Sequence, residues 1–237
     1  MFETLCIHPP LLWVFDLDNT LHDARPHVFP HINRSMTDYI RQHLRLDEAE
    51  AQALRLHYWR TYGATLKGLM HHHQIDARHF LQQTHRFDDL SRMLLPEPGL
   101  RQTLARLPGR RVVLTNGPLH YAERALQLMG VAGLFSAVYG VEHSGFRPKP
   151  DIAALHALLK AERVVPQRVV LVEDTLENLR PARQLGMRTV WISRSLRYPG
   201  WLDLRLPMLR GLPRAAAARG WLGSKRSHDV PGQDETT

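Results

Sequence analysis

The sequence predicts an α/β fold, with a Rossmann-like core around a parallel sheet and a small all-helical cap inserted after the first strand. Short apolar runs without polar alternation indicate strands that are buried on both faces, as parallel strands are. Helical patterns separate the later runs, which favours strand–helix–strand units with right-handed crossovers. The segment after the first run carries helical patterns and no strand pattern, which indicates an insertion. The apolar runs lie at 11–15, 112–114, 137–139, 169–172 and 189–192.

The first apolar run, LLWVF, ends on two aspartates, Asp16 and Asp18. Side chains at i and i+2 of a strand point to the same side, roughly 6–7 Å apart. Two like charges at that distance repel, and each favours protonation of the other. Packing gives no reason for such a pair at the end of a buried strand. We therefore expect a cation, a phosphate-handling site or simple exposure to water to compensate for the two charges.

The segment 21–95 is predicted to form the helical cap. Asp76 is expected to begin one of its helices, and the prolines and glycine at 96–99 mark the return to the core. The three consecutive histidines at 71–73 would point in different directions on a helix, so we expect an exposed helix end there rather than a metal site. The helical patterns cover about 32–44, 47–62, 76–85 and 88–95.

The second half of the chain supplies the remaining elements of the core. Gly130 and Gly186 are typical of the residue that follows a helix. Pro181 lies inside the last helical pattern, so the regular helix is expected to begin close to this proline, after an irregular turn. A strand-like segment at 202–206 and a helix near 207–219 are expected to complete the core. The three helical patterns cover about 118–129, the residues from 151 onward, and 175–185.

These elements predict a discontinuous core, a cap and a tail. The last residues of the chain are polar and lack any apolar pattern, which is typical of disorder. The predicted domains are 1–20 with 96–220 for the core, 21–95 for the cap and 221–237 for the tail.

Composition and charge narrow the class of protein. The chain has 237 residues and a formal net charge of +8. Residues 194–226 hold eight basic residues against one acid, whereas the part before them is nearly balanced. The only cysteine is Cys6, so no disulfide can form within the chain. No apolar run has the length of a membrane span, and the first residues lack a signal-peptide pattern, so we expect a cytoplasmic protein.

Polar residues follow four of the predicted strands, at the edge where open α/β sheets bind ligands. Carboxylates from two strands can hold Mg²⁺, and a hydroxyl, backbone N–H groups and a lysine can hold the oxygens of a phosphate. A free carboxylate can attack phosphorus, and a second acid can move the protons of the leaving group and of water. These residues are Asp16 and Asp18, Thr115 and Asn116, Lys149, and Glu173 and Asp174.

This pattern resembles that of the haloacid dehalogenase-like hydrolases, which carry Asp-x-Asp-x-Thr, then Ser or Thr, then Lys, then an acidic pair. The resemblance covers about 11–193. It implies that Asp16 is the nucleophile and a Mg²⁺ ligand, and that Asp18 is the general acid/base and gives its backbone carbonyl to the metal. It implies further that Thr115, the amide of Asn116 and Lys149 bind phosphate. Asp174 would be another metal ligand, with Glu173 beside it or acting through water.

The presence of Asp18 favours phosphoryl transfer over dehalogenation, since the dehalogenases of the superfamily lack this second acid. A narrower resemblance, to the pyrimidine 5′-nucleotidases, implies a nucleoside monophosphate as substrate. It rests on FDLDNTLHDA, YWRTYGATL, TNGP, GVEHSGFRPKPD and EDTLENLRPA. Tyr62 and Thr65 in the cap are candidates for contact with that substrate, whereas Tyr58 and Trp59 are expected in the cap core.

Two alternatives stay open at this point. The same chemistry on a sugar phosphate or phosphoglycolate would differ only in the cap. A nucleic-acid-binding protein with an idle site would use the basic residues of 194–226, although the balanced charge of the body argues against it. We expect a monomer or homodimer that acts on a small phosphate monoester without contact with a membrane.

Overall fold

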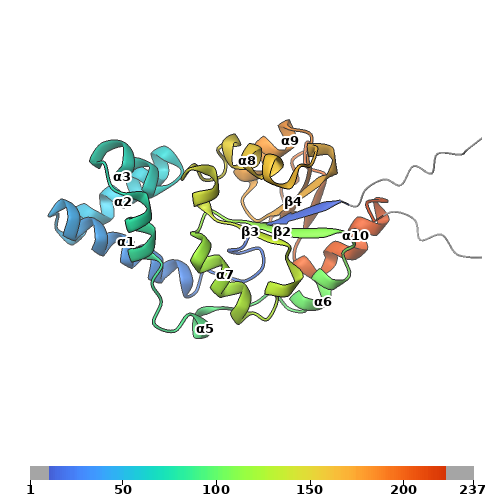
Figure 1. The fold of residues 1–237 in the computed structure, drawn as a ribbon, viewed down its shortest axis with the longest axis horizontal. Helices are drawn as coiled ribbons and strands as arrows, with labels where there is room; N and C mark the ends of the chain where they lie inside the picture. Colours follow the sequence, from blue (N-terminus) through green and yellow to red (C-terminus); the bar gives the residue numbers. More distant parts are fainter. Residues whose placement is uncertain (1–10, 223–237) are drawn as a thin grey trace, which may run out of the picture.

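The computed structural model describes residues 11–222 and contains a six-stranded sheet with every neighbouring pair of strands parallel (Figure 1). The strand order is β3-β2-β1-β4-β5-β6, so the first strand lies near the centre. The predicted fold class is confirmed. The strands are β1 (Leu12–Phe15), β2 (Arg110–Leu114), β3 (Ala137–Tyr139), β4 (Val169–Glu173), β5 (Arg188–Ile192) and β6 (Leu204–Leu206).

Alternate side chains of the central strands pack into two separate hydrophobic cores, one on each face of the sheet. Trp13 and Phe15 of β1 point into one core, and Leu12 and Val14 point into the other. Helices α6, α7 and α10 cover the first face, and α8 and α9 cover the second (Figure 1). Their bounds are α6 (Leu100–Ala105), α7 (Leu119–Leu128), α8 (Ile152–Glu162), α9 (Leu176–Gln184) and α10 (Leu212–Ala218).

The cap helices lie beyond one end of the sheet and share a third hydrophobic core (Figure 1). Asp47 and Glu50 form a capping box that begins α2, and Asp76 caps α4, as the sequence predicts for Asp76. The helices are α1 (Val28–Leu44), α2 (Glu48–Tyr62), α3 (Thr65–His73) and α4 (Ala77–Thr84), with α5 (Leu90–Met93) on the segment that returns to the core. The exact domain boundaries stay a prediction.

Several helix limits differ from expectation. The first cap helix begins at Val28, and the pattern at 88–95 gives only the short α5. The separate helix α3 was not expected; Gly63, at φ 76°, ends α2 and separates the two helices. Residues 71–73 do end α3 and are exposed, which confirms that expectation. Tyr58 is buried in the cap core as expected, but the expectation for Trp59 is wrong, because its side chain lies on the exposed side of α2.

The expectation that the last core helix begins close to Pro181 is wrong, because α9 begins at Leu176 and Pro181 lies inside it. A proline there cannot donate a hydrogen bond to the carbonyl of Glu177, and since Glu177 is exposed, water can replace the lost partner. Among residues 11–222, no helix is long and apolar enough to cross a membrane. Cys6 and most of the predicted tail lie outside the described residues.

Candidate active site

The site begins at the carboxyl ends of β1 and β4, two neighbouring strands. Phe15 is the register partner of Val172, so the next residues, Asp16 and Glu173, lie side by side. The backbone N–H of Asp16 donates to the carbonyl of Val172 at 2.9 Å, which fixes the chain as it leaves the strand. Register therefore brings together carboxylates that are far apart in the sequence.

Three carboxylates gather at this point. One oxygen each from Asp16, Glu173 and Asp174 lies within 4.8 Å of the other two. Asp16 and Glu173 are buried, and Asp174 is half-buried. The ammonium of Lys149 enters the same cluster: its Nζ donates to Asp16 Oδ1 at 2.8 Å and to the carbonyl of Leu114 at 2.8 Å, and lies 3.5 Å from Glu173 Oε1.

One lysine does not balance three carboxylates. Burial raises the pKa of Asp16, and the nearby Asp18 adds to the shift while Lys149 opposes it. Burial and the charge of Asp16 raise the pKa of Glu173 well above its ordinary value, and raise that of Asp174 to about 6. Burial would lower the pKa of Lys149, but Asp16 and Glu173 raise it, so the lysine stays charged.

The surplus of buried negative charge fits a divalent cation. Oxygen ligands from two neighbouring strands suit Mg²⁺, which prefers carboxylates and water. Glu173 is also held in place, since its Oε2 accepts the backbone N–H of Asp174 at 2.9 Å and its Oε1 accepts the side-chain amide of Asn178.

Asp18 lies on the loop that follows Asp16 and has its own hydrogen-bond partners. Asn19 adopts φ 63°, a conformation that asparagine tolerates better than most residues, and its N–H donates to the carbonyl of His22 at 2.7 Å. This tight turn brings the His22 ring back to Asp18, with Nε2 3.0 Å from Oδ1. The hydroxyl of Tyr121, from α7, donates to the same Oδ1 at 2.6 Å. Nothing in the sequence predicts a role for His22 or Tyr121, because no motif or spacing marks them.

The predicted phosphate-binding residues lie on the neighbouring strand end. Thr115 follows β2, is buried, and its Oγ1 accepts the N–H of Gly117 at 3.0 Å. The side-chain amide of Asn116 makes two bonds with the backbone of Lys149, at 2.9 Å to its carbonyl and 2.8 Å from its N–H. These two bonds fix the lysine's segment against the end of β2. The backbone N–H of Asn116 has no partner within the described part of the chain and is available to a phosphate.

The two cap residues predicted to contact substrate are not brought to the carboxylates. The Thr65 hydroxyl donates to the carbonyl of Arg55 on α2, and the Tyr62 hydroxyl bonds His72 Nε2 at 2.6 Å. Both contacts lie within the cap. Their part in substrate binding stays a prediction.

Comparisons with known proteins agree with this geometry. A protein-family model described as haloacid dehalogenase-like hydrolase matches residues 12–186. Phosphate metabolism protein 8 of Saccharomyces cerevisiae is 28% identical over 192 residues, which cover 74% of this chain but only 59% of the yeast protein. A phosphoglycolate phosphatase of Pseudomonas putida is 26% identical over 213 residues, covering 84% of this chain and 75% of that protein.

Solved structures show the same fold. A HAD phosphatase from Thermococcus onnurineus superposes with a TM-score of 0.62 at 21% identity, covering 86% of this chain and 97% of the other. An L-2-haloacid dehalogenase from Xanthobacter autotrophicus gives 0.58 at 17% identity, covering 88% and 98%. Since one is a phosphatase and the other a dehalogenase, the fold alone does not choose between the two reactions.

Proposed function

The chain belongs to the haloacid dehalogenase-like hydrolases, and from this premise we propose that it is a divalent-metal-dependent phosphatase that hydrolyses phosphate monoesters through an aspartyl-phosphate. One observation carries the proposal: a buried Asp16 contacts Lys149, and a second acid, Asp18, lies two residues further on. The relatives named as phosphatases support the same class of reaction. A phosphatase needs an acid that protonates the departing alkoxide, whereas a halide ion leaves without a proton.

In the first step, a carboxylate oxygen of Asp16 forms a bond to phosphorus and the bond from phosphorus to the ester oxygen breaks. Asp18 gives its proton to that oxygen, so the alcohol leaves neutral and Asp18 becomes a carboxylate. The ammonium of Lys149, which lies 2.8 Å from Asp16, offsets charge on the nucleophile and the phosphoryl oxygens. Thr115 and the backbone N–H of Asn116 would hold those oxygens.

In the second step, Asp18 takes a proton from water, and the water oxygen attacks phosphorus. The bond between phosphorus and Asp16 breaks, which returns Asp16 as a carboxylate and releases inorganic phosphate. Asp18 is protonated again and ready for the next ester. Both protons therefore pass through one side chain, and no co-reactant other than water is needed.

The family generally uses a divalent metal ion, usually Mg²⁺, and the residues present here fit one. Asp16, Asp174 and the backbone carbonyl of Asp18 would hold it, with Glu173 acting directly or through water. A bound divalent cation supplies positive charge that keeps Asp16 ionised and stabilises charge on the phosphoryl oxygens. Without it, the raised pKa of Asp16 works against nucleophilic attack.

For the substrate, we propose a pyrimidine nucleoside 5′-monophosphate, on the sequence stretches that resemble that subgroup. A second candidate is phosphoglycolate or a phosphorylated carbohydrate, which the names of several relatives favour. The catalytic residues are the same in both cases, and the cap has to make the distinction.

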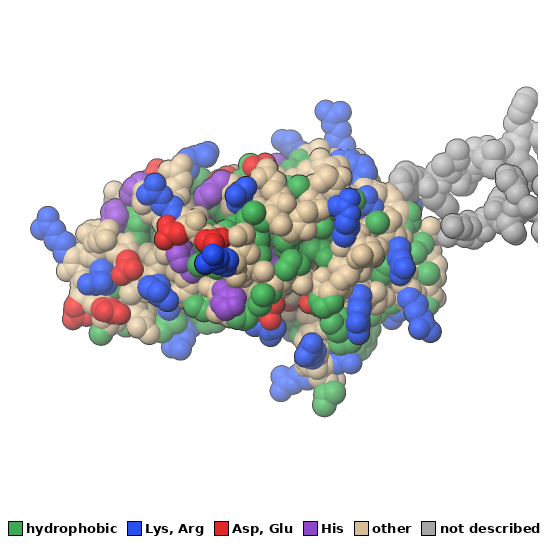
Figure 2. Space-filling model, turned by 90° about the horizontal axis from the view of Figure 1, so that it is seen from below, with side chains coloured by type: hydrophobic (Ala, Val, Ile, Leu, Met, Phe, Trp, Pro, Cys, Tyr) green, Lys and Arg blue, Asp and Glu red, His purple; other side chains and the backbone are tan. Residues whose placement is uncertain are grey.

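Nucleic-acid binding is the less favoured alternative. Figure 2 shows Lys and Arg side chains spread singly over the visible face, with other side chains between them. Binding to a phosphate backbone uses a continuous basic stripe or patch. A substrate of one phosphate group suits the small charged cluster at the sheet edge better.

The proposal is tested by phosphate release from a panel of monoesters, with Mg²⁺ and with EDTA. The panel contains UMP, CMP, dUMP, dTMP, AMP, GMP, phosphoglycolate and several sugar phosphates. We expect EDTA-sensitive release from pyrimidine nucleotides, and a loss of at least about 10³-fold in Asp16→Asn, since the nucleophile is removed.

The matched control is Asp38→Asn, the same change at an exposed position on α1. It should keep wild-type activity, and both variants should keep the wild-type circular dichroism spectrum. More than a few per cent of activity left in Asp16→Asn would refute the covalent mechanism. Release from phosphoglycolate or sugar phosphates alone would keep the mechanism and replace the substrate.

A further inference from the structure

Asp18 is held by two donors that reach the same oxygen. The Tyr121 hydroxyl lies 2.6 Å from Asp18 Oδ1, and His22 Nε2 lies 3.0 Å from it. The other oxygen, Oδ2, has no hydrogen-bond partner among residues 11–222. The two oxygens of the proposed acid/base are therefore not equivalent.

Both partners are fixed as donors by their surroundings. Tyr121 is 1% exposed, and burial together with the charge of Asp18 raises the pKa of its hydroxyl above the ordinary value, so it keeps its proton. His22 is fully buried, and its Nδ1 has no partner in the described part of the chain. A ring nitrogen within hydrogen-bond distance of a carboxylate oxygen donates to it, so Nε2 is assigned as the donor to Asp18, and the Tyr121 hydroxyl lies 3.3 Å from the same nitrogen.

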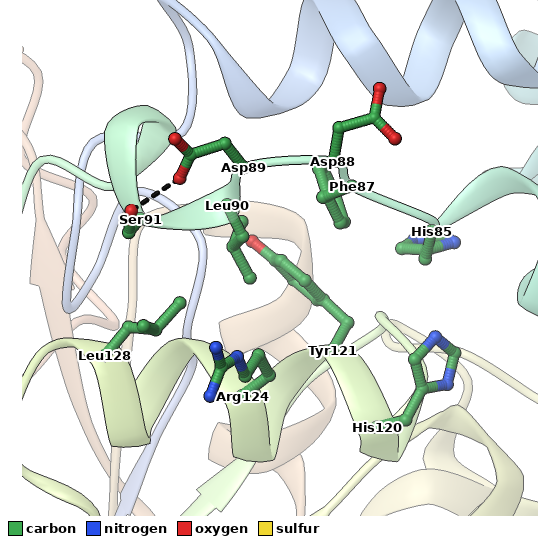
Figure 3. A pocket seen from close by; sticks show the side chains of 10 residues that line it. All are labelled: His85, Phe87, Asp88, Asp89, Leu90, Ser91, His120, Tyr121, Arg124 and Leu128. Carbon is green, nitrogen blue, oxygen red and sulfur yellow. Dashed lines mark hydrogen bonds between the residues drawn. The ribbon is translucent and has the colours of Figure 1, made fainter.

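The Tyr121 ring packs against the segment that connects the cap to the core. Figure 3 shows it between α7 and the segment 85–91, which connects the cap to the core. The ring of Phe87 stacks on it with centroids 5.4 Å apart, and His85 lies at 5.7 Å. These contacts and a neighbouring pocket of about 240 Å³ line the outer face of the ring. The hydroxyl is thus directed at Asp18 by packing.

We propose that Tyr121 and His22 are positioning residues that keep Oδ1 of Asp18 as a hydrogen-bond acceptor and so confine its transferable proton to Oδ2. A carboxyl oxygen that already accepts two hydrogen bonds has no room for a proton of its own. The proton then lies on the oxygen left free for the ester, and the carboxyl group cannot rotate it away. This inference rests on the proposed function and adds how its acid/base is oriented.

The test compares two esters in Tyr121→Phe, which removes the hydroxyl and keeps the packed ring. UMP, or phosphoglycolate if it is the better wild-type substrate, releases an alkoxide that needs a proton. p-Nitrophenyl phosphate releases a phenolate that departs without one. Since general acid catalysis contributes about 10²–10⁴-fold and the His22 contact remains, we expect kcat/KM, which reports only the steps up to departure of the alcohol, to fall by about 10- to 100-fold on the alkyl ester and by less than about threefold on the aryl ester.

Tyr139→Phe is the matched control, because it also removes a hydroxyl that donates to a carboxylate, that of Glu162, on the opposite face of the sheet. It should change neither rate, and the melting temperature of both variants should confirm that they are folded. An equal loss of kcat/KM on the two esters in Tyr121→Phe would show a merely structural role and overturn the inference. A wild-type protein that hydrolyses no ester would instead remove the proposed function, and the inference with it.

Discussion

His85 is a buried titratable residue on the segment that connects the cap to the core. Its Nδ1 donates to the hydroxyl oxygen of Thr84 at 3.0 Å, and that hydroxyl donates in turn to the carbonyl of Phe80. Burial lowers the pKa of His85 to about 4, although the charge of Asp18 opposes the shift. The folded protein therefore keeps this ring neutral at a pH where the unfolded chain would protonate it.

The lowered pKa predicts a loss of stability in mild acid. Below pH 6.5, His85 binds a proton in the unfolded chain but stays neutral in the folded protein. The contribution of neutral His85 to the free energy of unfolding is therefore complete above pH 6.5 and is lost as the pH falls toward 4. The shift corresponds to roughly 3 kcal/mol over that range. His85→Asn keeps a donor for Thr84 and cannot titrate. Its free energy of unfolding, measured by urea denaturation between pH 4 and 7, should depend less on pH than that of the wild type.

The control is His57→Gln, at an exposed position on α2. It should keep the wild-type pH dependence. If His85→Asn followed the wild-type curve as well, the acid sensitivity would belong to other groups.

Single residues divide into those that sequence can predict and those that only packing reveals. Asp16 and Glu173 could be placed at the sheet edge, because each stands at the end of a recognisable strand and parallel strands end at one edge. Lys149 lies further along the chain, on the loop beyond β3, and the family resemblance pointed to it. Tyr121 and His22 could not, because their role depends on the turn at 19–22 and on which face of α7 meets it. The cap residues Tyr62 and Thr65 lie in a stretch that carries the narrower family resemblance, and such a resemblance does not show which way a side chain points.

At the scale of elements, the close approach of α2 and α3 depends on a single glycine. A Cβ at Gly68 would lie 2.6 Å from Cβ of Tyr58 and would overlap the base of its ring. The Tyr58 ring is buried in the cap core and cannot turn away easily. The two helices can therefore pack this closely only because Gly68 has no side chain.

Gly68→Ala should destabilise the protein, although alanine is the better helix former. Overpacking costs about 1–3 kcal/mol, against a gain in helix propensity of about 0.8–1.0 kcal/mol. A net loss of about 1 kcal/mol lowers the melting temperature of a chain of this size by roughly 2–4 °C. Gly133→Ala is the control, since a Cβ there meets nothing within 4 Å. A higher melting temperature in Gly68→Ala would show that Tyr58 moves aside.

The strands were more predictable than the helix limits. The central strand β1 and the first four residues of its neighbour β4 are short continuous apolar runs that no polar residue interrupts. The limits of α2, α3 and α9 depend on local features that periodicity does not reveal. These are the left-handed turn at Gly63 and the inclusion of Pro181 within α9. Substrate choice is less predictable still, because it depends on how the cap meets the site.

At the scale of the whole molecule, the carboxylate cluster exists only when the sheet is formed. Asp16 follows β1, Glu173 ends β4, and strand pairing brings them together. In the unfolded chain these acids are separated by most of the sequence, so a divalent cation has no site there. A cation that binds the folded protein but not the unfolded chain raises the free energy of unfolding.

Mg²⁺ should therefore raise the melting temperature of the wild-type protein, independently of any substrate. At 100 times the dissociation constant, the gain in the free energy of unfolding is about 2.7 kcal/mol, or roughly 5–10 °C for a chain of this size. Differential scanning fluorimetry with increasing MgCl₂, at ionic strength held constant with NaCl, measures it. Asp174→Asn removes one carboxylate of the cluster and should lose most of the rise, whereas Asp38→Asn on the exposed face of α1 should keep it. An equal rise in Asp174→Asn would mean that Mg²⁺ acts elsewhere, and the surplus negative charge at the sheet edge would need another counter-ion.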